Sequence, residues 1–356
     1  MLKKATALFL VIVGIAAWMA CGKNQTHFVF ASVPGPSQLA VYREDPNSGV
    51  LTALTGSPFT IGPTPQSAVV HPSGNFLYIA NAGQSDISLF TIASNGVPTE
   101  VTPRVPTGTT PLLLAMDSAG TFLFAANAFS NNIYSYSIDS KSGALTVVGA
   151  PQGIGLSPLN MKLSPDGNFL FVTCAENNNV GVVQAFSVAS GVLTPVNGSP
   201  FQTGPNPGGL AISPSGAFLY TADSAINSIS EFSIDSTGAL TELPNSPFGQ
   251  ASSLTNPVSL LIDPTGQYMF VANEGSSNLS AYTIGSDGGL TVLSTPTFST
   301  GAQPNYTIMD SSGKYLLAGL QSGSIQVFVL DSSTGILTPE VTYSIGSTPS
   351  SITITK

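Results

Sequence analysis

The chain has 356 residues, of which 9 are Lys or Arg and 18 are Asp or Glu, and its formal net charge is −9. This acidic balance opposes binding to nucleic acid, whose phosphates repel a negative protein. Only 8% of the residues are charged, against roughly 25% in a typical soluble domain. With 36 Gly, 27 Pro and many hydroxyl and amide side chains, the composition favours short strands and frequent turns, and it predicts an all-β protein.

Residues 1–21 have the pattern of an export signal. Lys3 and Lys4 precede an uncharged apolar run over 5–20, which is short for a membrane span, and Cys21 follows. The end of this run resembles a bacterial lipobox, in which the cysteine is acylated and becomes the new N-terminus. We therefore expect a lipoprotein of the bacterial cell envelope anchored through Cys21. An ordinary cleaved signal and an uncleaved anchor are the alternatives.

After a short linker over 22–27, the remaining chain repeats one unit. Seven prolines spaced 45 to 50 residues apart open short apolar stretches: Pro65, Pro111, Pro158, Pro207, Pro257, Pro304 and Pro349. Most units continue with a Pro-x-Gly turn and an aromatic strand, as in Pro72-Ser73-Gly74 and Phe76-Leu77-Tyr78. A third strand carries an aromatic residue in every unit. The fourth begins at a Gly-x-Leu-Thr turn, kept at Gly49, Gly143, Gly191, Gly238 and Gly335 and more loosely at Gly96 and Gly289.

Four strands in this length are typical of one propeller blade. The chain ends complement each other, because residues 28–59 supply strands two, three and four, and residues 349–355 supply a first strand. Joining them pairs two otherwise open edges. The sequence therefore predicts a single, monomeric seven-bladed β-propeller over 28–356, with its seventh blade closed by both termini and its only membrane contact through the anchor.

A ligand site is expected at one mouth of the central channel. If the first strand of each blade is innermost, the residues after each proline and those ending the second strands open on the same face. The second-strand ends are Ser32, Asn81, Asn127, Cys174, Asp223, Asn273 and Leu320. Candidate ligand-binding residues are Asn81, Asn127 and Asn273, with Lys162 from an innermost strand. Alternatively, the short polar side chains bond local backbone, and Lys162 extends to channel water.

The repeat units, such as Phe76-Leu77-Tyr78-Ile79-Ala80-Asn81, resemble the seven-bladed lactonase family, which includes bacterial 6-phosphogluconolactonases and YVTN-repeat surface proteins. The resemblance covers 28–356. It implies, in members that open lactones, a His after one blade-opening Pro, an Arg-His pair at that place in the next blade, and acidic residues ending second strands. Asp223 and Glu274 fit the acidic places and are the candidate catalytic residues. Gly208-Gly209 and Val258-Ser259 stand where the His and Arg-His would be.

Lactone hydrolysis needs a base and a group that stabilises the oxyanion. A carboxylate can be the base, and the second group would be Lys162, a backbone N–H or a divalent cation. Asp223, Glu274 and Glu176 offer oxygen ligands for such a cation, but no ligand-spacing motif supports it, and no other cofactor is expected. Cys174 has no His on its face to activate it, so we interpret it as a packing residue.

Two hypotheses follow. The first is a non-catalytic, envelope-anchored propeller that binds a small molecule, a glycan or an envelope protein, and the missing bases favour it. The second is a divergent hydrolase of a sugar-acid lactone that uses Asp223 and Glu274, as the family resemblance implies. Export argues against a phosphorylated cytosolic substrate.

Overall fold

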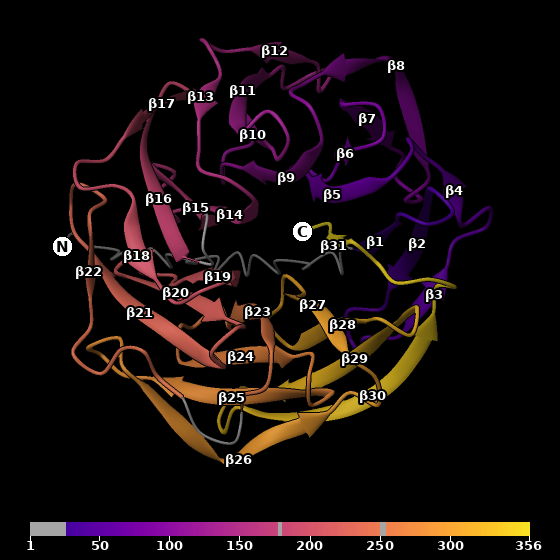
Figure 1. Cartoon of the computed structure of the whole chain (residues 1–356). Helices are drawn as coiled ribbons and strands as arrows, with labels where there is room; N and C mark the ends of the chain where they lie inside the picture. The colour runs from indigo at the N-terminus through magenta and orange to yellow at the C-terminus, as the bar shows by residue number, and fades with distance from the viewer. Residues whose placement is uncertain (1–25, 177–179, 250–253) are drawn as a thin grey trace, which may run out of the picture.

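The computed structural model describes residues 26–176, 180–249 and 254–356, which form seven antiparallel sheets arranged as a closed ring (Figure 1). The predicted seven-bladed β-propeller is therefore confirmed. The export signal and Cys21 lie outside the described residues. Within the described ranges, no helix is long and apolar enough to cross a bilayer.

The blades are numbered I to VII from the first complete unit. Blade I is β5 (Pro65–Val70), β6 (Phe76–Asn81), β7 (Asp86–Ile92) and β8 (Pro98–Pro106). Blade II is β9 (Pro111–Met116), β10 (Phe122–Asn127), β11 (Asn132–Ile138), β12 (Leu145–Val147) and β13 (Gln152–Gly153). Blade III is β14 (Pro158–Leu163), β15 (Phe169–Glu176), β16 (Val180–Ala189), β17 (Val192–Pro195) and β18 (Phe201–Thr203). Blade IV is β19 (Pro207–Ile212), β20 (Phe218–Asp223), β21 (Ser228–Ile234) and β22 (Leu240–Glu242). Blade V is β23 (Pro257–Ile262), β24 (Tyr268–Asn273), β25 (Asn278–Ile284) and β26 (Leu290–Ser299). Blade VI is β27 (Pro304–Met309), β28 (Tyr315–Leu320), β29 (Ser324–Asp331) and β30 (Ile336–Ser344). Blade VII is β31 (Ser351–Ile354), β1 (His27–Val33), β2 (Gln38–Glu44), β3 (Leu51–Ala53) and β4 (Phe59–Thr60).

Blade VII is closed by both ends of the chain, as predicted, and β1 begins at His27, one residue before the expected start. The C-terminal strand β31 pairs with β1 beside the channel (Figure 1). The Phe28 N–H donates to Thr355 Oγ1 at 2.8 Å, and the Thr355 N–H donates to the Phe28 carbonyl at 3.0 Å. In blade VI, Asp310 and Tyr315 make the same two contacts within a continuous turn. The junction of β31 and β1, which we call the seam, therefore has the contacts of a normal turn, although the two strands belong to opposite ends of the chain.

The innermost strands of blades I to VI each begin with a β-bulge directly after the repeat proline. In blade I, Pro65 pairs with Asn81 and Ser67 with Ala80, so Gln66 is the extra residue. The same shift occurs in the other five blades. A bulge leaves one residue unpaired and turns its side chain to a new direction. The residue after each proline is thereby turned toward the channel.

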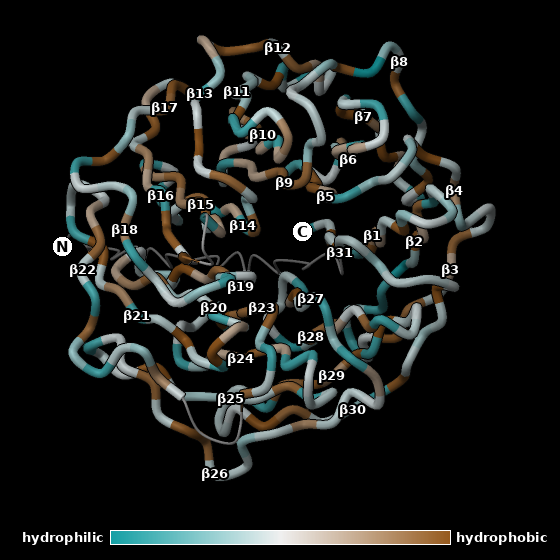
Figure 2. The backbone as a smooth tube through the Cα atoms, in the orientation of Figure 1, coloured by the Kyte–Doolittle hydropathy of each residue, from teal (hydrophilic) through white to brown (hydrophobic). Residues whose placement is uncertain are grey.

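The core consists of seven apolar layers, each between two neighbouring blades. Figure 2 shows hydrophobic stretches distributed over all seven blades rather than gathered in one region. Small side chains alternate with large buried aromatics such as Phe30, Phe124 and Phe270. Burial of apolar surface between blades is the main favourable term in the stability of such a ring.

One contact recurs at all seven blade interfaces. The glycine between the third and fourth strands lies on the aromatic residue at or next to the start of the second strand in the preceding blade. The pairs are Gly49 with Tyr315, Gly96 with Phe28, Gly143 with Phe76, Gly191 with Phe122, Gly238 with Phe169, Gly288 with Phe218 and Gly335 with Tyr268. In blade V this position is taken by Gly288 rather than by the expected Gly289. A Cβ atom would overlap the ring in each pair, so the turn glycine sets how closely the blades approach.

Candidate functional site

The central channel holds a cavity of about 550 Å³. Its wall includes the residue after every repeat proline: Gln66, Leu112, Leu159, Gly208, Val258, Asn305 and Ser350. This is the size range of small-molecule sites, which commonly combine apolar walls with a few polar groups. In blades I to VI, the β-bulge after the proline thus contributes one residue per blade to the wall of the candidate site.

Lys162 on β14 is the one Lys or Arg among the described residues that line this cavity, and the same set contains no Asp, Glu or His. The three ion pairs found in the described part of the chain involve His27 and Arg104, so Lys162 has no carboxylate partner there. Burial lowers the pKa of the Lys162 ammonium. A half-buried cation without a counter-ion leaves an uncompensated positive potential in the channel.

Hydrogen bonds between neighbouring innermost strands fix the channel wall. Ser67 Oγ accepts from the Leu114 N–H at 3.1 Å, and Ser259 Oγ accepts from the Thr307 N–H at 3.2 Å. The Asn305 amide donates to the Pro349 carbonyl at 2.7 Å, while its Oδ1 is buried without a hydrogen-bond partner. These bonds make the wall of the channel a preformed surface.

The predicted asparagines lie inside the blades. Asn81, Asn127 and Asn273 have no exposed surface. The Asn81 amide donates to Asp86 and Ser88 of the same blade at 2.7 and 2.9 Å. Asn127 and Asn273 make corresponding bonds to the third strands of their own blades. None of the three belongs to the residues that line the channel cavity, and their contacts are those of loop-closing side chains.

Asp223 is fully buried at the end of β20. Its carboxylate accepts from Ser230 Oγ at 2.6 Å, Thr221 Oγ1 at 2.9 Å and Thr203 Oγ1 at 3.3 Å. Burial raises the pKa of Asp223 to about 6, although the three hydroxyl bonds oppose this shift. Its oxygens are occupied by these partners, and Asp223 does not line the cavity.

Glu274 lies just after β24, in a loop where blades V and VI meet. It accepts from the amides of Gln321 at 2.8 Å and Asn256 at 3.1 Å. Pro158 pairs with Cys174 near the end of the second strand and so marks the same face of the ring. Lys162 lies four residues farther along β14, which at the rise of a β-strand is roughly 13 Å down the channel. The structure therefore separates Lys162 from the face that carries Asp223 and Glu274.

The carboxylates considered for a metal ion, Asp223, Glu274 and Glu176, form no group of close ligand atoms among the described residues. The group found there is His27, Glu44 and Asp310. The sequence did not predict this group, because Glu44 and Asp310 are far apart in the chain and come together only at the seam.

Cys174 is fully buried in the layer between blades II and III, and burial raises the pKa of its thiol to about 12. A thiol in this environment is protonated at neutral pH and is a poor nucleophile.

The fold and the channel define a seven-bladed β-propeller with a central ligand-sized cavity. The family described as "Lactonase, 7-bladed beta-propeller" matches residues 37–156, 114–204 and 155–296, and the chain belongs to this family. The 6-phosphogluconolactonases of Pectobacterium carotovorum and Pectobacterium atrosepticum are 30% identical to it over 146 residues, 40% of this chain and 43% of each relative.

Solved structures with the same fold extend over nearly the whole chain. A Bacteroides fragilis structure has a TM-score of 0.80 at 18% identity and covers 94% of this chain and 99% of its own. The periplasmic gluconolactonase of Pseudomonas aeruginosa has a TM-score of 0.75 at 18% identity, with 93% and 99% covered. At this identity the likeness shows the fold alone.

Proposed function

We propose that the protein binds a small, polar, negatively charged ligand, such as a sugar-acid carboxylate, in its central channel. The observation that carries this proposal is the unpaired Lys162 in a preformed cavity whose described lining contains no carboxylate. A ligand carboxylate would supply the missing counter-ion.

The chemistry of the cavity favours binding over hydrolysis. Opening a lactone requires a base within hydrogen-bond reach of a water molecule at the substrate. The described lining offers no imidazole or carboxylate, and Asp223 is held inside blade IV by three hydroxyl groups.

Calorimetry with gluconate on the purified full chain tests this proposal. We expect binding to the wild type, loss of binding in Lys162→Met, and unchanged binding in the matched variant Lys141→Met, which removes an exposed lysine. Equal gluconate affinity of Lys162→Met and the wild type would refute the channel site.

Family membership favours a second function, a divergent lactone hydrolase that uses Asp223 and Glu274. A lactone-opening assay with gluconolactone, with and without divalent metal ions, separates the two functions. Turnover that is abolished in Glu274→Gln would support the hydrolase and contradict a purely binding role. Unchanged background hydrolysis would contradict the hydrolase.

We also propose that the protein is exported and anchored through a lipid on Cys21, with its partners in the bacterial cell envelope. The basic start, the apolar run and the cysteine that follows it support this proposal. Mass spectrometry of the mature N-terminus tests it, with Cys21→Ala as the control that should remain without lipid. An unmodified Cys21 in the mature protein would refute it.

A further inference from the structure

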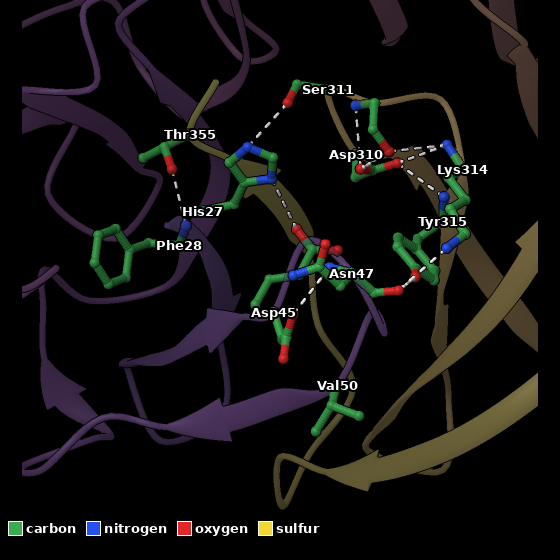
Figure 3. Close-up of polar contacts among 12 residues, drawn as sticks. His27, Phe28, Asp45, Asn47, Val50, Asp310, Ser311, Lys314, Tyr315 and Thr355 are labelled. Carbon is green, nitrogen blue, oxygen red and sulfur yellow. Dashed lines mark hydrogen bonds and ion pairs between the residues drawn. The ribbon is translucent and has the colours of Figure 1, made fainter. Parts of the chain in front are cut away.

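Three buried ionisable side chains meet at the seam of the ring, and two of them carry polar atoms without a hydrogen-bond partner. His27 at the start of β1 and Glu44 at the end of β2 belong to blade VII, and Asp310 follows β27 in blade VI. Figure 3 shows His27 and Asp310 close together. Their exposed fractions are 7%, 0% and 2%. Each offers a ligand atom within 4.8 Å of those of the other two.

Glu44 is the residue of this group that most clearly lacks hydrogen-bond partners. Both of its carboxylate oxygens are buried and lack a hydrogen-bond partner, as does Nδ1 of His27. None of the ion pairs in the described part of the chain gives Glu44 or Asp310 a Lys or Arg partner. Leaving a buried charge uncompensated costs several kcal/mol, so buried carboxylates are normally paired or bind metals.

The imidazole of His27 is oriented as a ligand. Its Nε2 lies 3.2 Å from Ser311 Oγ, to which it can donate (Figure 3). This tautomer leaves a lone pair on Nδ1, which lies 3.4 Å from Glu44 Oε2. Two lone pairs that face each other repel unless a cation or a proton lies between them. Metal-binding histidines usually donate a hydrogen bond from the opposite ring nitrogen in this way.

The separation of two of the three ligand atoms suits a tetrahedral ion. With metal–ligand distances of about 2.1 Å, two ligands of a tetrahedral site lie roughly 3.4 Å apart, which matches the separation of His27 Nδ1 and Glu44 Oε2. Asp310 already accepts from the N–H groups of Lys314 and Tyr315 through Oδ1. Its Oδ2 accepts from the Ser312 N–H at 3.1 Å and from the Ser312 hydroxyl. An ion bound to Oδ2 would take the place of the Ser312 hydroxyl, which can rotate away, and the N–H contacts of the turn would be kept.

We propose that His27, Glu44 and Asp310 form a binding site for one divalent transition-metal ion of the Zn²⁺ type, which ties the blade made from both chain ends to the blade before it. One nitrogen and two carboxylate ligands suit Zn²⁺ better than Ca²⁺, which prefers oxygen alone. The ion would neutralise both carboxylates. Because it connects β1, β2 and the turn after β27, its role is to stabilise the closed ring, independently of any ligand in the channel.

Zinc binding to the purified full chain without a histidine tag tests the proposal by calorimetry, metal analysis and thermal unfolding. We expect one Zn²⁺ per chain and a rise in Tm of roughly 5 °C at 100-fold excess over Kd. We also expect the visible spectrum of tetrahedral Co²⁺ after substitution. Glu44→Gln and His27→Gln should each weaken zinc binding by at least about 100-fold.

Two matched variants control for folding and for nonspecific uptake. Glu231→Gln neutralises another fully buried glutamate on a third strand, and Asp263→Asn changes the turn aspartate of blade V, which makes the same contacts as Asp310. Both should keep wild-type zinc affinity. The proposal is overturned if the wild type takes up no zinc, or if both Glu44→Gln and His27→Gln bind zinc as tightly as the wild type.

Discussion

The glycine-on-aromatic contact makes a specific prediction for Gly143→Ala. Gly143 has φ of +72°, where an L-residue costs about 1 kcal/mol or more. A Cβ atom there would lie 2.6 Å from Cδ1 of Phe76, and a displaced ring in a packed interface costs about 1–3 kcal/mol. The Gly143 carbonyl also accepts from the Tyr78 hydroxyl at 2.7 Å, so any shift weakens that bond. We expect a loss of about 2–4 kcal/mol in the free energy of unfolding.

Denaturant unfolding followed by circular dichroism measures this loss, with Gly301→Ala as the matched control. Gly301 has φ of +67°, and a Cβ atom there meets nothing within 4 Å. The control therefore has only the backbone cost of about 1 kcal/mol. Adding Phe76→Leu to Gly143→Ala should destabilise by less than the sum of the two single changes, because the shorter side chain relieves the overlap. Equal losses in Gly143→Ala and Gly301→Ala would refute the interface argument.

Three further predictions concern the buried charges, the seam and the channel. Burial raises the pKa of Glu231 from 4.5 to about 7, so the stability it contributes is complete below pH 4.5 and is lost as the pH rises through 7. The free energy of unfolding of the wild type should therefore fall between pH 5 and pH 8, and Glu231→Gln should remove about 2–3 kcal/mol of this fall. The same pH dependence of the unfolding free energy in both proteins would contradict this. Ile352→Asp places a carboxylate at a fully buried position of β31. It should destabilise the ring by at least about 3 kcal/mol and speed its proteolysis. A variant as resistant to proteolysis as the wild type would contradict closure of the ring through β31. Since burial lowers the pKa of Lys162, gluconate affinity should fall with rising pH before the ordinary lysine range of about 10.4, and a flat profile to that pH would argue against an ammonium–carboxylate contact.

The fold was predictable because each of its signals recurs in most units. A proline, a tight turn and an aromatic strand are weak evidence singly, but their repetition at a nearly constant spacing predicts a ring of blades. The seam was predictable for the same reason, since the missing first strand at one end matches the extra strand at the other.

The site was predicted less completely, because strand ends do not reveal side-chain direction. The expectation that residues after each proline open on the channel agrees with the cavity lining. The asparagines at the second-strand ends share that face but point into their own blades, where the third strand offers hydrogen-bond partners. The bulge that separates these two sets follows the repeat proline in six blades, but a proline alone does not show that a bulge forms there. The His27, Glu44 and Asp310 group depends on a tertiary contact between the two ends of the chain.

Lys162 occupies a position at which blade III differs from the other six blades. Lys162 pairs with Phe171, the third residue of the second strand in its blade. The residues that pair with the equivalent position in the other six blades are Val69, Ala115, Ala211, Leu261, Ile308 and Thr353. None of these six residues is charged, so the scaffold does not need a cation here.

A residue kept for function at a cost in stability should reveal both effects when it is replaced. Without ligand, Lys162→Met should raise the free energy of unfolding at neutral pH, because it removes a half-buried ammonium whose lowered pKa reflects its desolvation, while the apolar stem is kept. The same variant should lose gluconate binding. A destabilised variant that still binds gluconate would mean that Lys162 serves the packing of blade III, and that the ligand of this propeller binds elsewhere.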